Sequence, residues 1–208
     1  MALSLHERWL ALAGITQESI HLGDDLIARW AEPHRRYHTL EHLERVLDGV
    51  DEFGDFADDV AAVRYAAWFH DAVYDGGPDS ADNEERSAQL AEAELPALQV
   101  PDKQVAEVAR LVRLTKGHAV TDGDHNGSVL CDADLAVLGS TPDAYAAYAH
   151  AIREEYADIP DDQFRSGRAA ILRGLLEQPE LFRTPVAAER YEKRARANLT
   201  AEIAELEG

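Results

Sequence analysis

The residues best suited to chemistry are a histidine and an aspartate next to each other, His70 and Asp71. Two further histidines, His38 and His42, lie about thirty residues upstream, and Asp132 lies about sixty residues downstream. Imidazole nitrogens and carboxylate oxygens are the mixed donors that Mn, Fe, Ni, Co and Zn accept. The residue types therefore predict a metal site.

Apolar residues surround the His-Asp pair, since Trp68 and Phe69 precede it and Val73 follows. This pattern predicts burial, and buried polar side chains need partners, which a metal ion supplies. Neighbouring residues of a helix point about 100° apart, so the other ligands have to come from other helices. A helical bundle with an inward-facing site would position them.

The rest of the chain favours such a bundle, because helix start and stop signals dominate and strand alternation is nearly absent. Thr141-Pro142 and Thr184-Pro185 are typical helix starts, and Gly117 is typical of a helix end. The expected helices cover residues 5–13, 17–31, 40–50, 59–74, 83–95 and 101–117, and a short helix ends at 138 after a loop over 118–128. We therefore predict an all-α fold.

The 208 residues suit one domain, 1–208, with a metal-site core over about 30–140 and C-terminal helices over about 141–205 packing on it. The 20 basic and 40 acidic residues give a net charge of −20, which repels phosphate backbones and excludes duplex nucleic acid as an expected partner. No run approaches a membrane span, the N-terminal residues are charged, and Cys131 is the single cysteine. These features predict a cytoplasmic protein without a membrane partner, and they are compatible with a homo-oligomer.

Several motifs resemble those of the HD superfamily of metal-dependent phosphohydrolases, which are helical bundles with a His, a His-Asp pair and a late Asp on separate helices. They are His42-Leu-Glu-Arg-Val, His70-Asp71 and Asp132-Ala-Asp134. A small bacterial group of predicted HD phosphohydrolases is similar over roughly residues 30 to 200, through Arg36-Tyr-His-Thr-Leu-Glu-His42, Trp68-Phe-His-Asp-Ala-Val-Tyr-Asp75, Asn83-Glu-Glu-Arg-Ser-Ala88 and Leu130-Cys-Asp-Ala-Asp-Leu-Ala-Val-Leu-Gly139.

The resemblance implies one divalent transition metal (Mn, Fe, Ni, Co or Zn, with Mg also compatible) bound by His42, His70, Asp71 and Asp132. Two choices stay open. His38 and His42 are four residues apart and share a helix face if the helix begins early enough, so either could be the upstream ligand. Asp132 and Asp134 cannot point the same way on a helix. We prefer His42 and Asp132, with His38 as a substrate contact and Asp134 as a catalytic or supporting carboxylate.

The implied reaction is hydrolysis of a phosphoester or phosphoanhydride in a small phosphorylated metabolite, such as a nucleotide, by a metal-activated water. The candidates for proton transfer are Glu84, which we prefer, Asp75 and Asp134. The candidates for substrate contact are His38, His118, Lys116 and Arg36, with Arg168 as a further cation.

Two other functions are compatible with the sequence. A di-iron oxygenase of the HD type would need extra ligands, for which His38, His118 and His125 are available. A non-catalytic, nucleotide-binding regulatory module would bind its ligand without forming a product.

Overall fold

Side-chain caps fix the helix starts that the sequence signals. Ser4 and Thr16 each accept a hydrogen bond from the third residue of the helix that follows, α1 (Leu5–Ala13) and α2 (Gln17–Trp30). Thr141 and Thr184 do the same for α8 (Pro142–Glu155) and α10 (Pro185–Glu207), each of which has proline at its first position. These contacts satisfy backbone N–H groups that a helix leaves unpaired.

The computed structural model describes residues 3–75 and 82–208 and contains ten α-helices in those ranges, with no strand among the described residues. Besides α1, α2, α8 and α10, the helices are α3 (Leu40–Phe53), α4 (Val60–Phe69), α5 (Asn83–Glu94), α6 (Asp102–Leu114), α7 (His125–Leu135) and α9 (Asp161–Leu176). Short 3₁₀ helices follow three of them: η1 (Gly54–Phe56), η3 (Leu95–Leu98) and η4 (Ala136–Gly139). The predicted all-α fold is confirmed.

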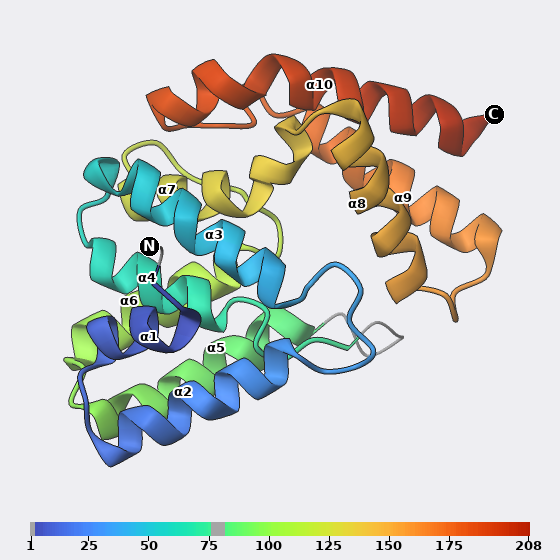
Figure 1. The fold of residues 1–208 in the computed structure, drawn as a ribbon. Helices are drawn as coiled ribbons and strands as arrows, with labels where there is room; N and C mark the ends of the chain where they lie inside the picture. Colours follow the sequence, from blue (N-terminus) through green and yellow to red (C-terminus); the bar gives the residue numbers. More distant parts are fainter. Residues whose placement is uncertain (1–2, 76–81) are drawn as a thin grey trace.

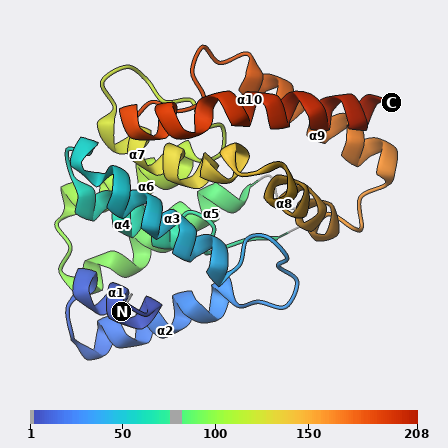
Figure 2. The same ribbon diagram turned by 45° about the horizontal axis from the view of Figure 1, so that its top comes forward.

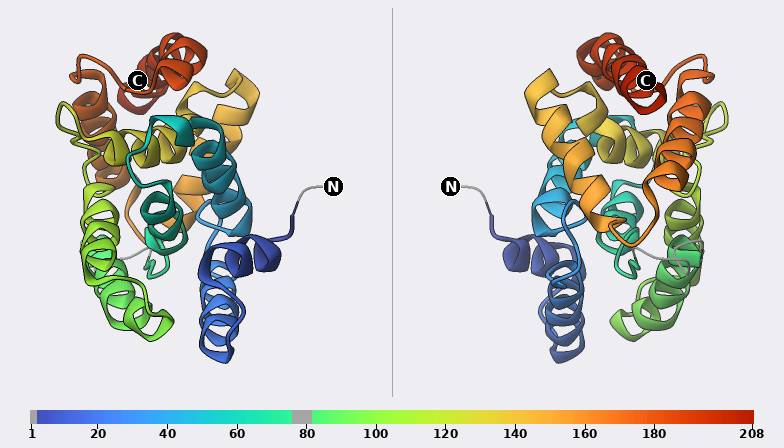
Figure 3. Two further views of the ribbon diagram at one scale, coloured as in Figure 1. Left: turned by 90° about the vertical axis from the view of Figure 1, so that its left-hand side faces the viewer. Right: turned by 90° about the vertical axis from the view of Figure 1, so that its right-hand side faces the viewer.

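The centre of the molecule is formed by α3, α4 and α7, which pack against one another (Figure 1). The α1–α2 pair and the α5–α6 pair flank α4 (Figure 3). Helix α10 lies across η4 and α9, while α8 also reaches η4 (Figure 2). The expected boundary between a metal-site core and C-terminal helices stays a prediction. Among the described residues, no helix has both the length and the apolar character that crossing a membrane requires.

Three tryptophans from different helices pack beside the His70-Asp71 segment. The rings of Trp9 and Trp68 pack edge to face with centroids 5.2 Å apart, and the Trp30 ring lies 5.2 Å from the imidazole of His70. The Trp30 indole N–H donates to the Trp68 carbonyl at 3.0 Å, so its polar atom is satisfied although the ring is fully buried. This packing joins α1 and α2 to the end of α4.

The end of α4 differs from the expected one. The helix stops at Phe69 rather than Tyr74, because the Ala72 N–H turns back to the Phe69 carbonyl. The Val73 N–H then bonds to the Ser87 hydroxyl of α5 at 3.0 Å, which draws the chain away from the helix axis. His70 and Asp71 therefore lie in a turn, where two consecutive side chains can approach one point.

The start of α7 also differs from the expected one. Helix α7 begins at His125, inside the segment 118–128 that was expected to be a loop, because the Asp124 carboxylate accepts the Gly127 N–H at 2.9 Å and caps the helix. Helix α3 begins at Leu40, so His38 lies in the segment before it.

Helices α3 and α7 approach each other unusually closely at Gly49. A Cβ atom placed on Gly49 would lie only 2.9 Å from the Cβ of Ala133 and 3.1 Å from its Cα. Only glycine allows this approach without displacing α7. The contact matters because α3 carries His42 and α7 carries Asp134.

Candidate metal centre

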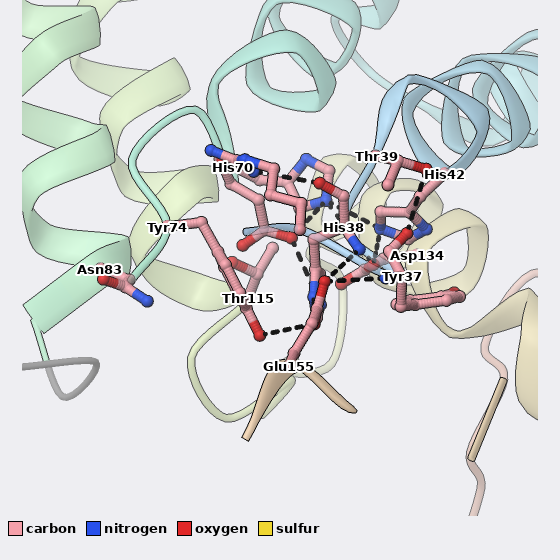
Figure 4. A network of polar contacts seen from close by, with 12 residues as sticks. Tyr37, His38, Thr39, His42, His70, Tyr74, Asn83, Thr115, Asp134 and Glu155 are labelled. Atoms are coloured by element: carbon pink, nitrogen blue, oxygen red, sulfur yellow. Dashed lines mark hydrogen bonds and ion pairs between the residues drawn. The ribbon is translucent and has the colours of Figure 1, made fainter. Parts of the chain in front are cut away.

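Two histidines and an aspartate from separate segments meet at the centre of the molecule. His42 projects from the first turns of α3, and His70 and Asp71 come from the turn after α4 (Figure 4). The Nε2 atoms of His42 and His70 are 3.3 Å apart, and the His70 Nε2 is 3.3 Å from an Asp71 carboxylate oxygen. The three side chains form a largely buried cluster that could hold a metal ion.

A backbone contact sets the orientation of the His70 ring. Its Nδ1–H donates to the Ala67 carbonyl at 2.8 Å. In the neutral imidazole, the lone pair is then on Nε2, the atom that faces His42 and Asp71. A carbonyl partner on the far nitrogen is the usual support of a histidine that ligates a metal.

Asp134 of α7 closes the cluster on its other side. Its Oδ1 lies 3.2 Å from the His42 Nε2 and 3.6 Å from the His70 Nε2, and its Oδ2 accepts a 2.8 Å hydrogen bond from the His118 Nε2. His118 has a φ of 50°, in the left-handed region that non-glycine residues rarely adopt. The loop after α6 thus holds His118 against this carboxylate and orients it.

Asp132, the preferred fourth ligand, faces away from the histidines. It is buried, and its carboxylate accepts the backbone N–H groups of Arg183 and Thr184 at 2.7–3.0 Å. Two residues along a helix correspond to about 200° of rotation, so Asp132 and Asp134 cannot both face the cluster. The preference for Asp132 is corrected in favour of Asp134 by this geometry.

His38 lies at the edge of the cluster and is held by Glu155 of α8. Its Nδ1 is 2.7 Å from the Glu155 Oε2, while its Nε2 points to Asp71 at 3.8 Å. The other Glu155 oxygen accepts the backbone N–H groups of residues 36, 37 and 38 at 2.7–2.9 Å. One carboxylate thereby fixes both the loop before α3 and the ring of His38 (Figure 4).

Arg35 and Tyr74 complete this support. The buried Arg35 guanidinium donates to the carbonyls of His38 and Asp71 at 3.1 and 2.8 Å, which ties the two segments together. The Tyr74 ring stacks on His38 at 4.1 Å, and its hydroxyl donates to Glu155 at 3.1 Å. No local sequence pattern indicates these supporting roles.

The charges of the cluster favour a cation at its centre. Burial lowers the pKa of His70, but the charge of Asp71 and the contact with Asp134 outweigh burial and raise that pKa to about 9. Burial raises the pKa of Asp134, yet hydrogen bonds from His118, His42 and His70 bring it well below its ordinary value. For His42, burial outweighs the contact with Asp134 and lowers the pKa, so this ring is neutral more readily than a free imidazole.

The spacing of the donor atoms suits one ion. The ligand atoms of His42, His70 and Asp71 all lie within 4.8 Å of one another, and Asp134 adds an oxygen at 3.2–3.6 Å from both histidines. Two atoms that each lie about 2.1 Å from a metal are about 3.0–3.4 Å apart at octahedral or tetrahedral angles. Nitrogen and oxygen donors of this kind suit divalent transition metals.

A cavity of about 710 Å³ opens beside the cluster. Next to the cluster its lining includes His38, Asp71, Glu84, Lys116, His118 and Asp134, and Arg168 lines it farther away on α9. The half-buried Glu84 has one carboxylate oxygen that is shielded from solvent and has no hydrogen-bond partner among the described residues. Burial raises the pKa of this carboxyl. The structure therefore gathers four of the expected catalytic and substrate-contact residues, His38, Glu84, Lys116 and His118, around the cluster.

Two of the expected site residues lie elsewhere. Asp75 forms an ion pair with Arg86 and does not line this cavity. The exposed Arg36 donates to the Pro33 and Arg35 carbonyls and lines a second pocket, between α3 and α8, whose lining also includes His42 and Asp134. Arg36 thus lies outside the larger cavity, in a pocket that reaches the same cluster.

Comparisons of the chain with protein-family models, with curated proteins and with solved structures found no match. Function has to be inferred from the chain's own residues.

Proposed function

We propose that the protein is a metal-dependent phosphohydrolase, as its resemblance to the HD superfamily implies. The observation that carries the proposal is the convergence of two histidines and two aspartates at the wall of a large cavity. His42, His70, Asp71 and Asp134 would hold one divalent ion. The single cysteine, Cys131, is buried and fits the cytoplasmic location that belongs to the same proposal.

A bound divalent ion would activate a water molecule and polarise the phosphorus centre. His42 and His70 would offer their Nε2 atoms to it, and the Ala67 carbonyl accepts the hydrogen bond of the His70 Nδ1–H and so holds that ring in the required orientation. His118 holds Asp134 through the oxygen that does not face the histidines. These contacts fix the ligands before any substrate arrives.

Glu84 is the proposed proton-transfer residue, because it lines the same cavity and because burial raises the pKa of its carboxyl. Lys116 supplies a positive charge to the cavity wall and is suited to contact a phosphate oxygen. His38, held by Glu155, faces the same space and would contact the substrate next to Asp71.

The position of His125 disfavours the di-iron alternative. It was one of three histidines available as extra ligands, but its ring packs on Phe56 and pairs with Asp58. His118 is bound to Asp134, and His38 is bound to Glu155. A single metal ion thus accounts better for the described donors than two.

Metal content, measured by mass spectrometry on protein purified without chelator, tests the proposal. We expect about one ion per chain, which His70→Ala and Asp71→Ala lose and which the control His125→Ala, outside the cluster, keeps. The loaded protein should release phosphate from a panel of nucleotides and phosphoesters with Mn, Co, Ni or Mg. Two irons per chain with oxygen-dependent turnover, or no metal under any loading condition, would refute the proposal. Saturable nucleotide binding without product would instead indicate a regulatory module.

A further inference from the structure

The cavity beside the cluster has two chemically different walls. One wall carries the histidines and carboxylates described above, from the segment before α3, the turn after α4, the loop after α6, and helices α5 and α7. The remaining wall, which α8 and α9 largely form, carries the apolar side chains of Leu138, Ile152, Ile159, Phe164, Ile171 and Leu175, interspersed with Tyr148, Tyr156, Gln163, Arg168 and Gln178. A ligand that fills the cavity must therefore combine a polar group with an apolar one.

Helix α9 leaves space on the apolar side. Ile171 is 62% exposed, which is unusual for a large apolar side chain, and it faces the cavity. Gly167 and Gly174 lie on the same helix face, and a Cβ atom on either would meet no atom within 4 Å. The wall thus offers an uncovered apolar surface with room for a bulky group, continuous with the metal cluster.

The charges of the lining favour a single phosphate. Three carboxylates, Asp71, Glu84 and Asp134, line the cavity, against the cations Lys116 and Arg168. The Arg168 guanidinium is already bound to Glu202 at 2.8 Å and to the Tyr148 hydroxyl at 3.1 Å. Because Asp71 and Asp134 would balance the proposed ion, Lys116 and Arg168 are the side-chain cations left in the lining, against Glu84, and they balance the charge of one phosphate better than the several charges of a polyphosphate chain.

We propose that the substrate is a monophosphate ester of an apolar or aromatic organic group, and that this group lies against Ile171 between Gly167 and Gly174. The inference rests on the proposed phosphohydrolase function, in which the phosphate is held at the cluster. It narrows the substrate class from nucleotides and phosphoesters in general to amphipathic monoesters.

Binding in the cavity is tested with two phosphate esters that differ in the size of the organic group. Their alcohols have similar acidity, so the leaving group does not account for a difference in rate. With Mn²⁺-loaded protein, kcat/KM for 2-(1-naphthyl)ethyl phosphate should exceed that for ethyl phosphate by at least about tenfold, because burial of the ring in the apolar wall stabilises the bound state. Adenosine monophosphate should be hydrolysed faster than adenosine triphosphate. Equal kcat/KM values for the two alkyl esters, or a preference for the triphosphate, would overturn the proposal.

Substitutions on α9 locate the binding surface. Gly167→Phe and Gly174→Phe fill the space, so the preference for the naphthyl ester should fall about tenfold. Ala170→Phe is the matched control, since Ala170 is exposed on the same helix but does not line the cavity. An equal loss of preference in the control would overturn the assignment of the surface.

Binding of non-hydrolysable phosphonates tests the inference without turnover. Calorimetry should show tighter binding of 2-(1-naphthyl)ethylphosphonate than of ethylphosphonate, with the difference reduced by Gly167→Phe and kept by Ala170→Phe. This result without hydrolysis of any ester would support the cavity assignment and refute the enzymatic function. Equal affinities of the two phosphonates would refute the cavity assignment even in an active phosphohydrolase.

Discussion

Asp132 and Asp134 lie two residues apart on α7 and serve opposite sides of the helix. Asp134 reaches the nitrogen of His42 at 3.2 Å, whereas Asp132 accepts the N–H of Thr184 at 2.7 Å, just before α10 begins. One short stretch of α7 therefore contributes to the cluster and also anchors the last helix.

Substitution of each aspartate should separate the two roles. Asp134→Asn removes a charged ligand and should lower metal content well below one ion per chain. Asp132→Asn keeps the metal but should lower the free energy of unfolding by about 2 kcal/mol, because an amide replaces an acceptor of buried N–H groups. Metal analysis and urea unfolding of both variants check this. Loss of metal only in Asp132→Asn would reverse the assignment.

Glu155 should act on catalysis through His38. Glu155→Gln weakens the contact that orients the His38 ring, so we expect kcat to fall about 10–100-fold while metal content stays unchanged. The pH profile of kcat should also shift, which a merely structural role would not produce. The neighbouring Glu154→Gln is the control, since Glu154 is half exposed and contacts only His150 at 3.5 Å among the ion pairs of the described residues.

The Glu155 carboxylate should make the free energy of unfolding depend on pH in the acid range. Burial raises the pKa of Glu155, but the contact with His38 and the backbone N–H groups outweigh it and lower that pKa from 4.5 to about 2. Because the pKa of Glu155 is lower in the folded state than in the unfolded state, the ionised carboxylate stabilises the fold above pH 4.5. This stabilisation is lost as the pH falls toward 2. The Glu155 carboxylate thereby contributes about 3 kcal/mol to the free energy of unfolding.

Urea unfolding at a series of pH values checks this prediction. The stability of the parent should fall more steeply between pH 5 and pH 2 than that of Glu155→Gln, by up to about 3 kcal/mol. Parallel curves for the two proteins would show that Glu155 does not carry this dependence.

Gly49→Ala should disturb the cluster from a distance. The added methyl group would overlap Ala133, the residue next to Asp134, so α3 and α7 would have to separate. We expect a loss of about 1–3 kcal/mol in stability together with weaker metal binding. Gly174→Ala is the control, because its Cβ meets no atom within 4 Å and alanine favours a helix by about 1 kcal/mol. Denaturation midpoints and metal titration measure both effects.

The sequence predicted the helical class well, because caps and stop signals are local. It also placed His42, His70 and Asp71 in one site, which the structure brings together. The sequence could not show, for a physical reason, that Asp134 rather than Asp132 faces the histidines. Residues 126–133 of α7 are all buried, so no polar face indicates how the helix is turned.

The role of Glu155 could not be predicted from the local sequence pattern. It lies in the charged stretch Arg153-Glu154-Glu155, which is typical of an exposed helix face. Its contact with His38 joins residues 117 positions apart. Arg35 is equally inconspicuous beside Arg36, although only Arg35 is buried. Such long-range polar contacts arise from the packing of the helices and become visible only in the folded structure.

The support that Glu155 gives to His38 also has a consequence for biosynthesis. A growing chain emerges from the ribosome N-terminus first, so all four proposed ligands are available once residue 134 has emerged. Glu155 and the amides of Arg183 and Thr184 follow only later. The nascent protein thus acquires its proposed ligands before Glu155, so His38 can take its final position beside them only when α8 has been made.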